Sequence, residues 1–462
     1  MRPMRAPAVM PALTLALACA LVAVPAAADP VQKGPYLQHL SSTSVDLKLE
    51  LRAPGPVTVT VSRDAPDAGA PLTFSSPVAP FHTVHVAGLS PATRYRYSVH
   101  VGTHPASGGT TRDSVHEVPQ ASHDATFVTA PADTSHEPFT FLAYGDNRTD
   151  GPAHERVVQA IAKESYDFLV NTGDFVNQGS DEDAWQSFFD IEEPILKDHC
   201  LFACIGNHEL HNDKAAVHFE RYLAPVEPTA IDPAPPIYGS FRWGRARFFL
   251  LNAFDEWQEG RERVWLEAML NRADKEEGVD LRIAVLHHGP YSAGPHGDNK
   301  AFLAAHIDEL LTAHHVDLVL AGHDHIYERG EAHGLKYVIT GGGGAPLYRE
   351  LTPRPSTRKV EAAYNYVMTT VTDGQVSITA KRPDGSLIET CAFVRGGSWL
   401  CDPPPPQPAA EHAPVTTTTT TPPPAMRCSH VPGEPSAPGL ATASFVLLGL
   451  ALSLARRRRV AS

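Results

Sequence analysis

The first part of the chain alternates apolar and polar residues with a period of two. Residues 45–51, 57–61 and 95–101 each place an apolar side chain at every second position, and proline or glycine lies between the runs. Such alternation is typical of antiparallel strands that bury one face and expose the other. We therefore predict an N-terminal β-sandwich over residues 29–132, with no cluster of catalytic residue types.

The pattern changes after a short linker, and residues 137–390 form a second predicted domain. Short, wholly apolar runs now alternate with longer amphipathic stretches, which indicates βαβ units and a largely parallel sheet. The predicted strands are Phe139–Tyr144, Phe168–Asn171, Leu201–Ile205, Ile283–Leu286 and Leu318–Ala321. The predicted helices are Pro152–Ser165, Asp181–Leu196, Arg261–Asn271 and Lys300–Ala313, and Tyr366–Thr372 with Gln375–Lys381 forms a closing hairpin.

Each of these five apolar runs is followed by a loop that carries Asp, Asn or His. Ligands bind beyond the carboxyl ends of the strands in an open α/β sheet, so these loops can converge on one site. Helix caps and turns would explain any one loop, but not five in succession with metal-ligand chemistry. The loops are Gly145-Asp146-Asn147-Arg148, Thr172-Gly173-Asp174, Gly206-Asn207-His208-Glu209, His287-His288-Gly289-Pro290 and Gly322-His323-Asp324-His325.

In their order and spacing, these loops resemble the signature of the calcineurin-like metallophosphoesterases. The segments Gly322–Arg329 and Tyr238–Phe248 resemble the purple acid phosphatase branch, and Leu89–Tyr97 resembles a corner of fibronectin type III domains. The resemblance implies a fibronectin III-like sandwich in front of a catalytic domain with two sheets packed between helix layers. It also implies a phosphoester hydrolase.

The resemblance implies that Asp174 bridges two transition-metal ions, Fe, Mn or Zn. One ion would take Asp146, Asp174 and His325, and the other would take Asp174, Asn207, His288 and His323. His287 and His288 are neighbours in extended chain, so only one of them can face the site. The His-x-Pro register selects His288, which leaves His287 as a packing residue or as a residue that supports the ligands.

Three further residues carry expected roles in catalysis. His208, beside Asn207, is the expected general acid, and His296 is either a substrate-facing histidine or a surface residue. Arg148 stands where many metallophosphoesterases have a histidine ligand, and it would either bind phosphate in a bidentate manner or form a salt bridge. Asn177 stands where purple members have tyrosine, so the first ion lacks its usual fourth ligand unless Asn177 or water completes the set.

The two ends of the chain predict export. Residues 1–28 have the charge and apolar pattern of a secretory signal peptide. Residues 402–438 are rich in Pro and Thr, residues 439–455 are apolar and uncharged, and residues 456–462 carry an arginine cluster. This tail is interpreted either as a permanent membrane anchor with a cytoplasmic end or as a sorting signal that resembles the MYXO-CTERM class. The protein is expected at the cell envelope or outside the cell.

Cysteine usage and charge narrow the picture further. Cys391 and Cys401 flank a short segment and could pair outside the cytoplasm, whereas Cys200 and Cys204 are expected as buried thiols. The formal net charge of −14 argues against nucleic acid as a partner. The expected function is hydrolysis of small phosphomonoesters. The alternatives are a phosphodiesterase of the same fold and a surface protein that binds phosphate with little catalysis. The sequence indicates no oligomeric state.

Overall fold

The computed structural model describes residues 29–66, 69–102, 122–223, 237–254, 257–258 and 260–402. The predicted signal peptide, the spacer from residue 403, the apolar segment 439–455 and the arginine-rich end lie outside the described residues. Among the helices that the structure describes, none is long and apolar enough to cross a membrane.

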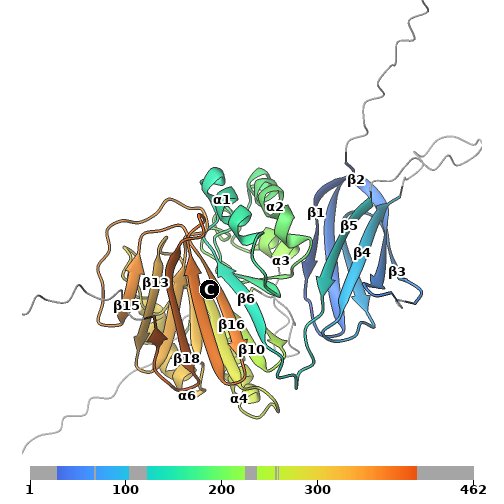
Figure 1. Cartoon of the computed structure of the whole chain (residues 1–462). Coiled ribbons are helices and arrows are strands. Elements are labelled where there is room, and N and C mark those ends of the chain that lie inside the picture. Colours follow the sequence, from blue (N-terminus) through green and yellow to red (C-terminus); the bar gives the residue numbers. More distant parts are fainter. Residues whose placement is uncertain are drawn as a thin grey trace, which may run out of the picture. The chain divides into compact units, whose positions relative to one another are not determined.

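The N-terminal region consists of antiparallel strands, as the alternating pattern predicts (Figure 1). The 20-residue strand β2 pairs with β1, β3 and β4, and β5 pairs with β4. The apolar positions of β2, such as Val45, Leu47 and Val59, are fully buried. The β-rich fold is therefore confirmed, while the fibronectin III-like sandwich stays a prediction. The strands are β1 Val31–Gln38, β2 Ser44–Arg63, β3 Leu72–Ala87, β4 Arg94–Val101 and β5 Ser122–Val128.

The second region contains two mixed sheets of seven strands each. In the first sheet the order is β19-β18-β17-β16-β6-β7-β8, and only β6, β7 and β8 run parallel. Parallel pairing is thus confined to one end of the sheet, because the predicted hairpin and the strands after it add antiparallel strands at the other end. The strands are β6 Phe139–Tyr144, β7 Phe168–Asn171, β8 Leu201–Ala203, β16 Tyr366–Thr372, β17 Gln375–Lys381, β18 Leu387–Val394 and β19 Leu400–Cys401.

The second sheet has the order β15-β13-β14-β12-β11-β10-β9. Its central strands β10, β11, β12 and β14 are parallel, and the flanking strands are antiparallel. The strands are β9 Gly239–Trp243, β10 Ala246–Leu251, β11 Leu281–His288, β12 Leu318–Gly322, β13 Tyr327–Ala332, β14 Leu335–Thr340 and β15 Thr357–Glu361.

The two sheets pack face to face through an aromatic core. Phe141 and Phe168 of the first sheet contact Phe248 of the second at ring-centroid distances of 5.3 Å and 5.6 Å. Helices α1 Gly151–Ile161, α2 Glu182–Leu196 and α3 Val217–Leu223 cover the outer face of the first sheet. Helices α4 Arg261–Ala273, α5 Lys300–Ala304 and α6 Ile307–Ala313 cover the second. The central strands are apolar throughout because both of their faces are buried, and the expected layer order is confirmed.

One predicted helix is interrupted. The stretch expected as a single helix over residues 300–313 forms α5 and α6, with His306 between them at φ 56°. A left-handed residue cannot continue a right-handed helix, so the apolar period alone overestimated the length of this element.

The end of the second region is closed by a disulfide bond. Cys391 on β18 and Cys401 on β19 are bonded, as predicted, and they are paired in register across the two strands. Cys200 and Cys204 are free and buried, which confirms the other half of the cysteine prediction.

Candidate metal centre

The strand-end loops of both sheets meet at one place. The backbone N–H of Asp146 donates to the carbonyl of Gly173 at 2.9 Å, which joins the loops after β6 and β7. The N–H of His323, after β12, donates to Asp146 Oδ2 at 3.0 Å, and the N–H of His208, after β8, donates to Asp174 Oδ1 at 3.1 Å. The structure therefore brings together the loops that the sequence pattern singles out.

Three residues at this junction have strained backbones. Asp146, Asp174 and His323 lie at φ 59°, 62° and 70°. The left-handed region is unfavourable for residues with a Cβ, and such strain persists where the surrounding structure imposes it, commonly at functional sites. Here it turns each side chain off the end of its strand toward a common point.

At that point, several atoms that can bind a metal ion face one another. The Nδ1 atom of His287 lies 2.7 Å from the carbonyl oxygen of Thr172, so it carries a ring proton, and Nε2 is the nitrogen that faces the centre. That Nε2 lies 3.3 Å from Asp174 Oδ1 and 3.2 Å from His323 Nδ1. These atoms can stay so close only if a metal ion or a further proton lies among them.

Asn207 lies in the loop after β8, next to His208. Its buried Oδ1 accepts no hydrogen bond from any residue that the structure describes, whereas buried polar atoms normally have a partner. Because Gly206 has no side chain, its backbone can lie against Asp174, whereas a Cβ at this position would be 2.2 Å from Asp174 Oδ1. Imidazole, carboxylate and amide ligands suit Fe, Mn or Zn, and the His287 bond to a carbonyl is the usual support for a metal-binding histidine. Asp146, Asp174 and His287, whose ligand atoms lie within 4.8 Å of one another, fit a metal ion.

The structure places both adjacent histidines at the centre. His287 faces the carboxylates, whereas the ring centroid of His288 lies 4.5 Å from that of His323 and its Nε2 lies 3.1 Å from the carbonyl oxygen of Gly297. Ile283, Val285 and His287 share the strand face that packs on the first sheet, and that face ends at the site. The alternation of side chains along this strand favours His287, whereas the His-x-Pro motif favours His288.

The other expected ligand set is arranged differently. Asp146 is fully buried, and its Oδ1 lies 3.5 Å from His325 Nε2. Arg148 also reaches this side: its Nε donates to Asp174 Oδ2 at 3.0 Å and its Nη2 lies 3.2 Å from His325 Nε2. Of the two roles expected for Arg148, the structure shows the salt bridge.

Asn177 does not supply the missing ligand. Its side chain is exposed, and its contact with the site is a main-chain carbonyl that lies 2.8 Å from His208 Nδ1. That bond leaves His208 Nε2 on the side of Asp174, 3.8 Å from Oδ2. Burial lowers the pKa of His208 despite the opposing charge of Asp174.

His296 lies at the mouth of the centre. Its ring centroid is 4.0 Å from that of His323, and its Nδ1 lies 2.8 Å from Asp324 Oδ1. Asp324 is itself buried and accepts a hydrogen bond from the Ser292 hydroxyl. The structure thus places His296 beside His323 and against Asp324, while its role toward substrate stays a prediction.

The electrostatics of the centre favour bound positive charge. Burial disfavours the charged form of His287, but Asp174 and Asp146 outweigh it and raise the pKa of His287 to about 9. Burial raises the pKa of Asp146 well above its usual value. For His325, burial lowers the pKa to about 4, with Arg148 acting in the same direction. A cation that replaces the proton on His287 would relieve this imbalance.

Two residues of the site were not assigned a role from the sequence. Glu209 is fully buried and accepts backbone hydrogen bonds from the loops after β7 and β8. Tyr348 stacks on His325 with a centroid distance of 4.3 Å and an interplanar angle of 10°. Glu209 belongs to a recognised motif, whereas Tyr348 lies in a loop without any local pattern that would mark it.

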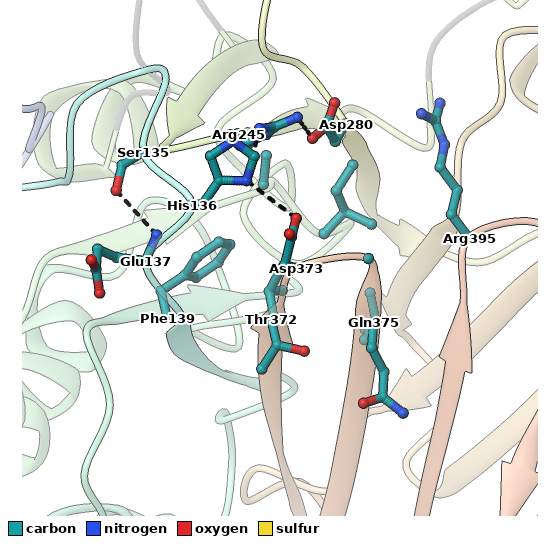
Figure 2. Close-up of a pocket in the computed structure, with 15 residues that line it drawn as sticks. Ser135, His136, Glu137, Phe139, Arg245, Asp280, Thr372, Asp373, Gln375 and Arg395 are labelled. Atoms are coloured by element: carbon teal, nitrogen blue, oxygen red, sulfur yellow. Dashed lines mark hydrogen bonds and ion pairs between the residues drawn. The ribbon is translucent and has the colours of Figure 1, made fainter.

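A separate cavity of about 250 Å³ lies at the other end of the first sheet (Figure 2). Phe139, which begins β6, lines it, whereas Asp146 follows the end of the same strand. Two pairs form among its polar side chains, His136 with Asp373 at 3.2 Å and Arg245 with Asp280. This cavity is distinct from the candidate metal centre.

Comparison with known proteins agrees with this geometry. Residues 139–327 match the family model described as calcineurin-like phosphoesterase. The chain therefore carries a calcineurin-like metallophosphoesterase domain.

The curated relatives include purple acid phosphatases of Arabidopsis thaliana. The chain is 25% identical over 271 residues to probable purple acid phosphatase 20, which covers 54% of this chain and 62% of the relative. It is 25% identical over 281 residues to purple acid phosphatase 21, covering 57% and 58%. The chain thus spans less than two thirds of the length of these relatives.

Solved structures support the fold. A purple acid phosphatase from yellow lupin (Lupinus luteus) seeds has a TM-score of 0.66 at 15% identity, covering 78% of this chain and 74% of that one. A structure of PhoD has a TM-score of 0.61 at 13% identity, covering 82% and 93%. At these identities the likeness concerns the fold alone.

Proposed function

We propose that this chain is an exported, metal-dependent phosphohydrolase that cleaves phosphomonoesters. The observation that carries the proposal is the convergence of Asp146, Asp174 and His287, whose ligand atoms lie within 4.8 Å of one another, with His323 Nδ1 3.2 Å from His287 Nε2. The matching phosphoesterase domain and the purple acid phosphatase relatives support a metal-dependent phosphatase.

These four residues would hold a metal ion. A bound ion supplies Lewis acidity and lowers the pKa of a water molecule. Of the two ions that the resemblance implies, this one has a set of donor atoms that is free to bind it.

The chain's own side chains supply the remaining functions. The Nδ1 bond to the Asn177 carbonyl orients His208 so that Nε2 faces the centre, where the imidazolium form can protonate the leaving alkoxide. Asp324 orients His296 in the same manner at the opposite rim. Arg148 places a permanent positive charge beside Asp174.

This arrangement favours monoesters over diesters. Arg148, His208 and His296 surround the centre with one permanent charge and two proton donors, which suits a phosphate that carries two negative charges. A phosphodiester carries one charge fewer and a second bulky group. A phosphodiesterase of the same fold is therefore the second candidate.

Turnover and metal binding test the proposal together. The purified protein should hydrolyse p-nitrophenyl phosphate faster than bis(p-nitrophenyl) phosphate, and removal of metal by a chelator should abolish turnover until metal is restored. Asp174→Ala should lose both metal and activity. Full turnover in this variant would contradict the assignment, and metal or phosphate binding without turnover would favour a surface phosphate-binding protein.

Export is part of the proposal. It rests on the pattern of residues 1–28 and of the tail after residue 402, and the tail is either an anchor or a sorting signal. The Cys391–Cys401 disulfide supports an oxidising compartment. Fractionation of cells that express the full chain, with detection of cleaved residues 1–28, tests this part.

A further inference from the structure

Arg148 lies where the sequence resemblance implies a metal ion. Three side chains were expected to hold that ion, Asp146, Asp174 and His325, and the guanidinium contacts the last two at 3.0 Å and 3.2 Å. The Arg148 side chain is only 13% exposed. It is therefore enclosed in the centre and does not extend into solvent.

The contact with His325 uses the lone pair that a metal would need. His325 Nδ1 lies 2.7 Å from the carbonyl oxygen of Pro346, which can only accept, so Nδ1 carries the proton. Nε2 is then the acceptor, and the Arg148 Nη2 donates to it. The stacked ring of Tyr348 fixes the plane of the imidazole. One nitrogen lone pair cannot bind a guanidinium N–H and a metal ion at the same time.

The carboxylate of Asp174 is divided between two positive positions. Oδ2 accepts from Arg148 Nε, while Oδ1 faces His287 Nε2 at 3.3 Å on the side where Asn207 and His323 lie. A bridging carboxylate between two cations has this arrangement. Here the guanidinium of Arg148 already fills one of the two positions.

We propose that the Arg148 guanidinium takes the place of one of the two metal ions, so that the centre binds a single ion at Asp146, Asp174 and His287, beside His323. The inference rests on the proposed function and changes the composition of its centre. A second divalent ion would have to displace Arg148 or lie against a like charge. Exposed Asn177 offers it no side-chain ligand in compensation.

The bound guanidinium keeps hydrogen-bonding capacity for substrate. Its Nε donates to Asp174, Nη2 to His325 and Nη1 to the Thr149 hydroxyl at 3.2 Å. A guanidinium has five N–H groups, so one remains on each terminal nitrogen. These two can donate to two oxygens of one phosphate, the contact that arginine forms best.

Metal counting tests the inference directly. The purified full chain is loaded with Mn(II), desalted and analysed for manganese per chain, and its EPR spectrum is recorded. We expect one ion per chain with the six-line signal of an isolated Mn(II). Arg148→Ala should double the bound manganese and broaden the spectrum through coupling between two ions. Arg156→Ala, an exposed arginine on α1, is the matched control and should leave the count at one.

A histidine pair keeps the test decisive if Arg148→Ala fails to fold. His325→Ala should retain the single ion, whereas His287→Ala should lose it. Two coupled ions in the unsubstituted protein, loss of an ion in His325→Ala, or an unchanged count in a folded Arg148→Ala would each overturn the inference. Turnover of p-nitrophenyl phosphate separates the two proposals: two ions with turnover refute only this inference, and no ion with no turnover refutes both.

Discussion

Glu209 ties together the two loops that carry Asp174 and Asn207. Its carboxylate is fully buried and accepts four backbone N–H groups. Oε2 accepts from Asp174 at 2.9 Å and Gly206 at 2.8 Å, and Oε1 accepts from Phe175 at 2.8 Å and from Val176 at 3.3 Å. Glu209→Gln changes one of these oxygens into an amide nitrogen of similar size.

The expected cost follows from the donors left without an acceptor. A glutamine keeps one acceptor oxygen, so two buried backbone N–H groups would face its NH2 group. Each buried donor without a partner costs about 1–3 kcal/mol, which gives a loss of ~4 kcal/mol in the free energy of unfolding. This is a large part of the total stability of a typical domain. The metal affinity should fall as well, because Asp174 and Asn207 lose their common support.

Urea unfolding at pH 8 measures this loss. Burial, with the charge of Asp174, raises the pKa of Glu209 to about 7, so at pH 8 the carboxylate is mostly ionised even in metal-free protein. Glu155→Gln on the exposed face of α1 is the matched control and should stay within about 0.5 kcal/mol of the unsubstituted protein. If Glu209→Gln behaved like this control and bound metal normally, the carboxylate would not support the loops.

Three further predictions concern pH, the disulfide and the general acid. The native metal-free protein should hold protons on Glu209 and His287 that the unfolded chain has released, because both pKa values are raised, to about 7 and about 9. Above pH 7, where the histidines of lowered pKa such as His325 no longer titrate, its stability should therefore fall as pH rises toward 9, and a urea midpoint that rises from pH 7 to 9 would contradict the argument. Replacing Cys391 and Cys401 by serine opens a loop with a sequence separation of 10 and should cost about 2–3 kcal/mol, with kcat unchanged; an altered kcat would show that the closure also shapes the site. His208→Gln should lower kcat by about 100-fold or more for an alkyl phosphate, whose leaving group needs a proton, and much less for p-nitrophenyl phosphate. An equal loss on both substrates would exclude His208 as the proton donor.

The local sequence pattern was sufficient to predict most helices and strands and the position of the candidate metal centre. The bounds of β6, β7, β16 and β17 agree with the predicted strands, because apolar runs bounded by Gly-Asp turns or joined by Asp-Gly leave little freedom of register. The same loops placed Asp146, Asp174, Asn207, His323 and His325 together. These loops converge because the carboxyl ends of parallel strands lie at the same edge of a sheet.

Only the tertiary structure decided which side chains face the centre. His287 and His288 point to opposite faces of β11, and the sequence does not say which face meets the other sheet. The register between β11 and β12 also shifts after Val285, so a motif counted along the chain need not keep its facing in space.

The position of Arg148 depends on the tertiary structure for a different reason. Its long side chain could have reached solvent, a phosphate or a carboxylate, and sequence separation does not rank these partners. The folded chain brings Asp174 and His325, 26 and 177 residues away, within hydrogen-bond distance of one guanidinium. The sequence by itself determined that a charged, metal-binding centre forms at these loops. Long-range packing decided that Arg148 supplies part of the positive charge of this centre. Only the assembled sheets fix which carboxylate and imidazole atoms face the guanidinium and which are left for a metal ion.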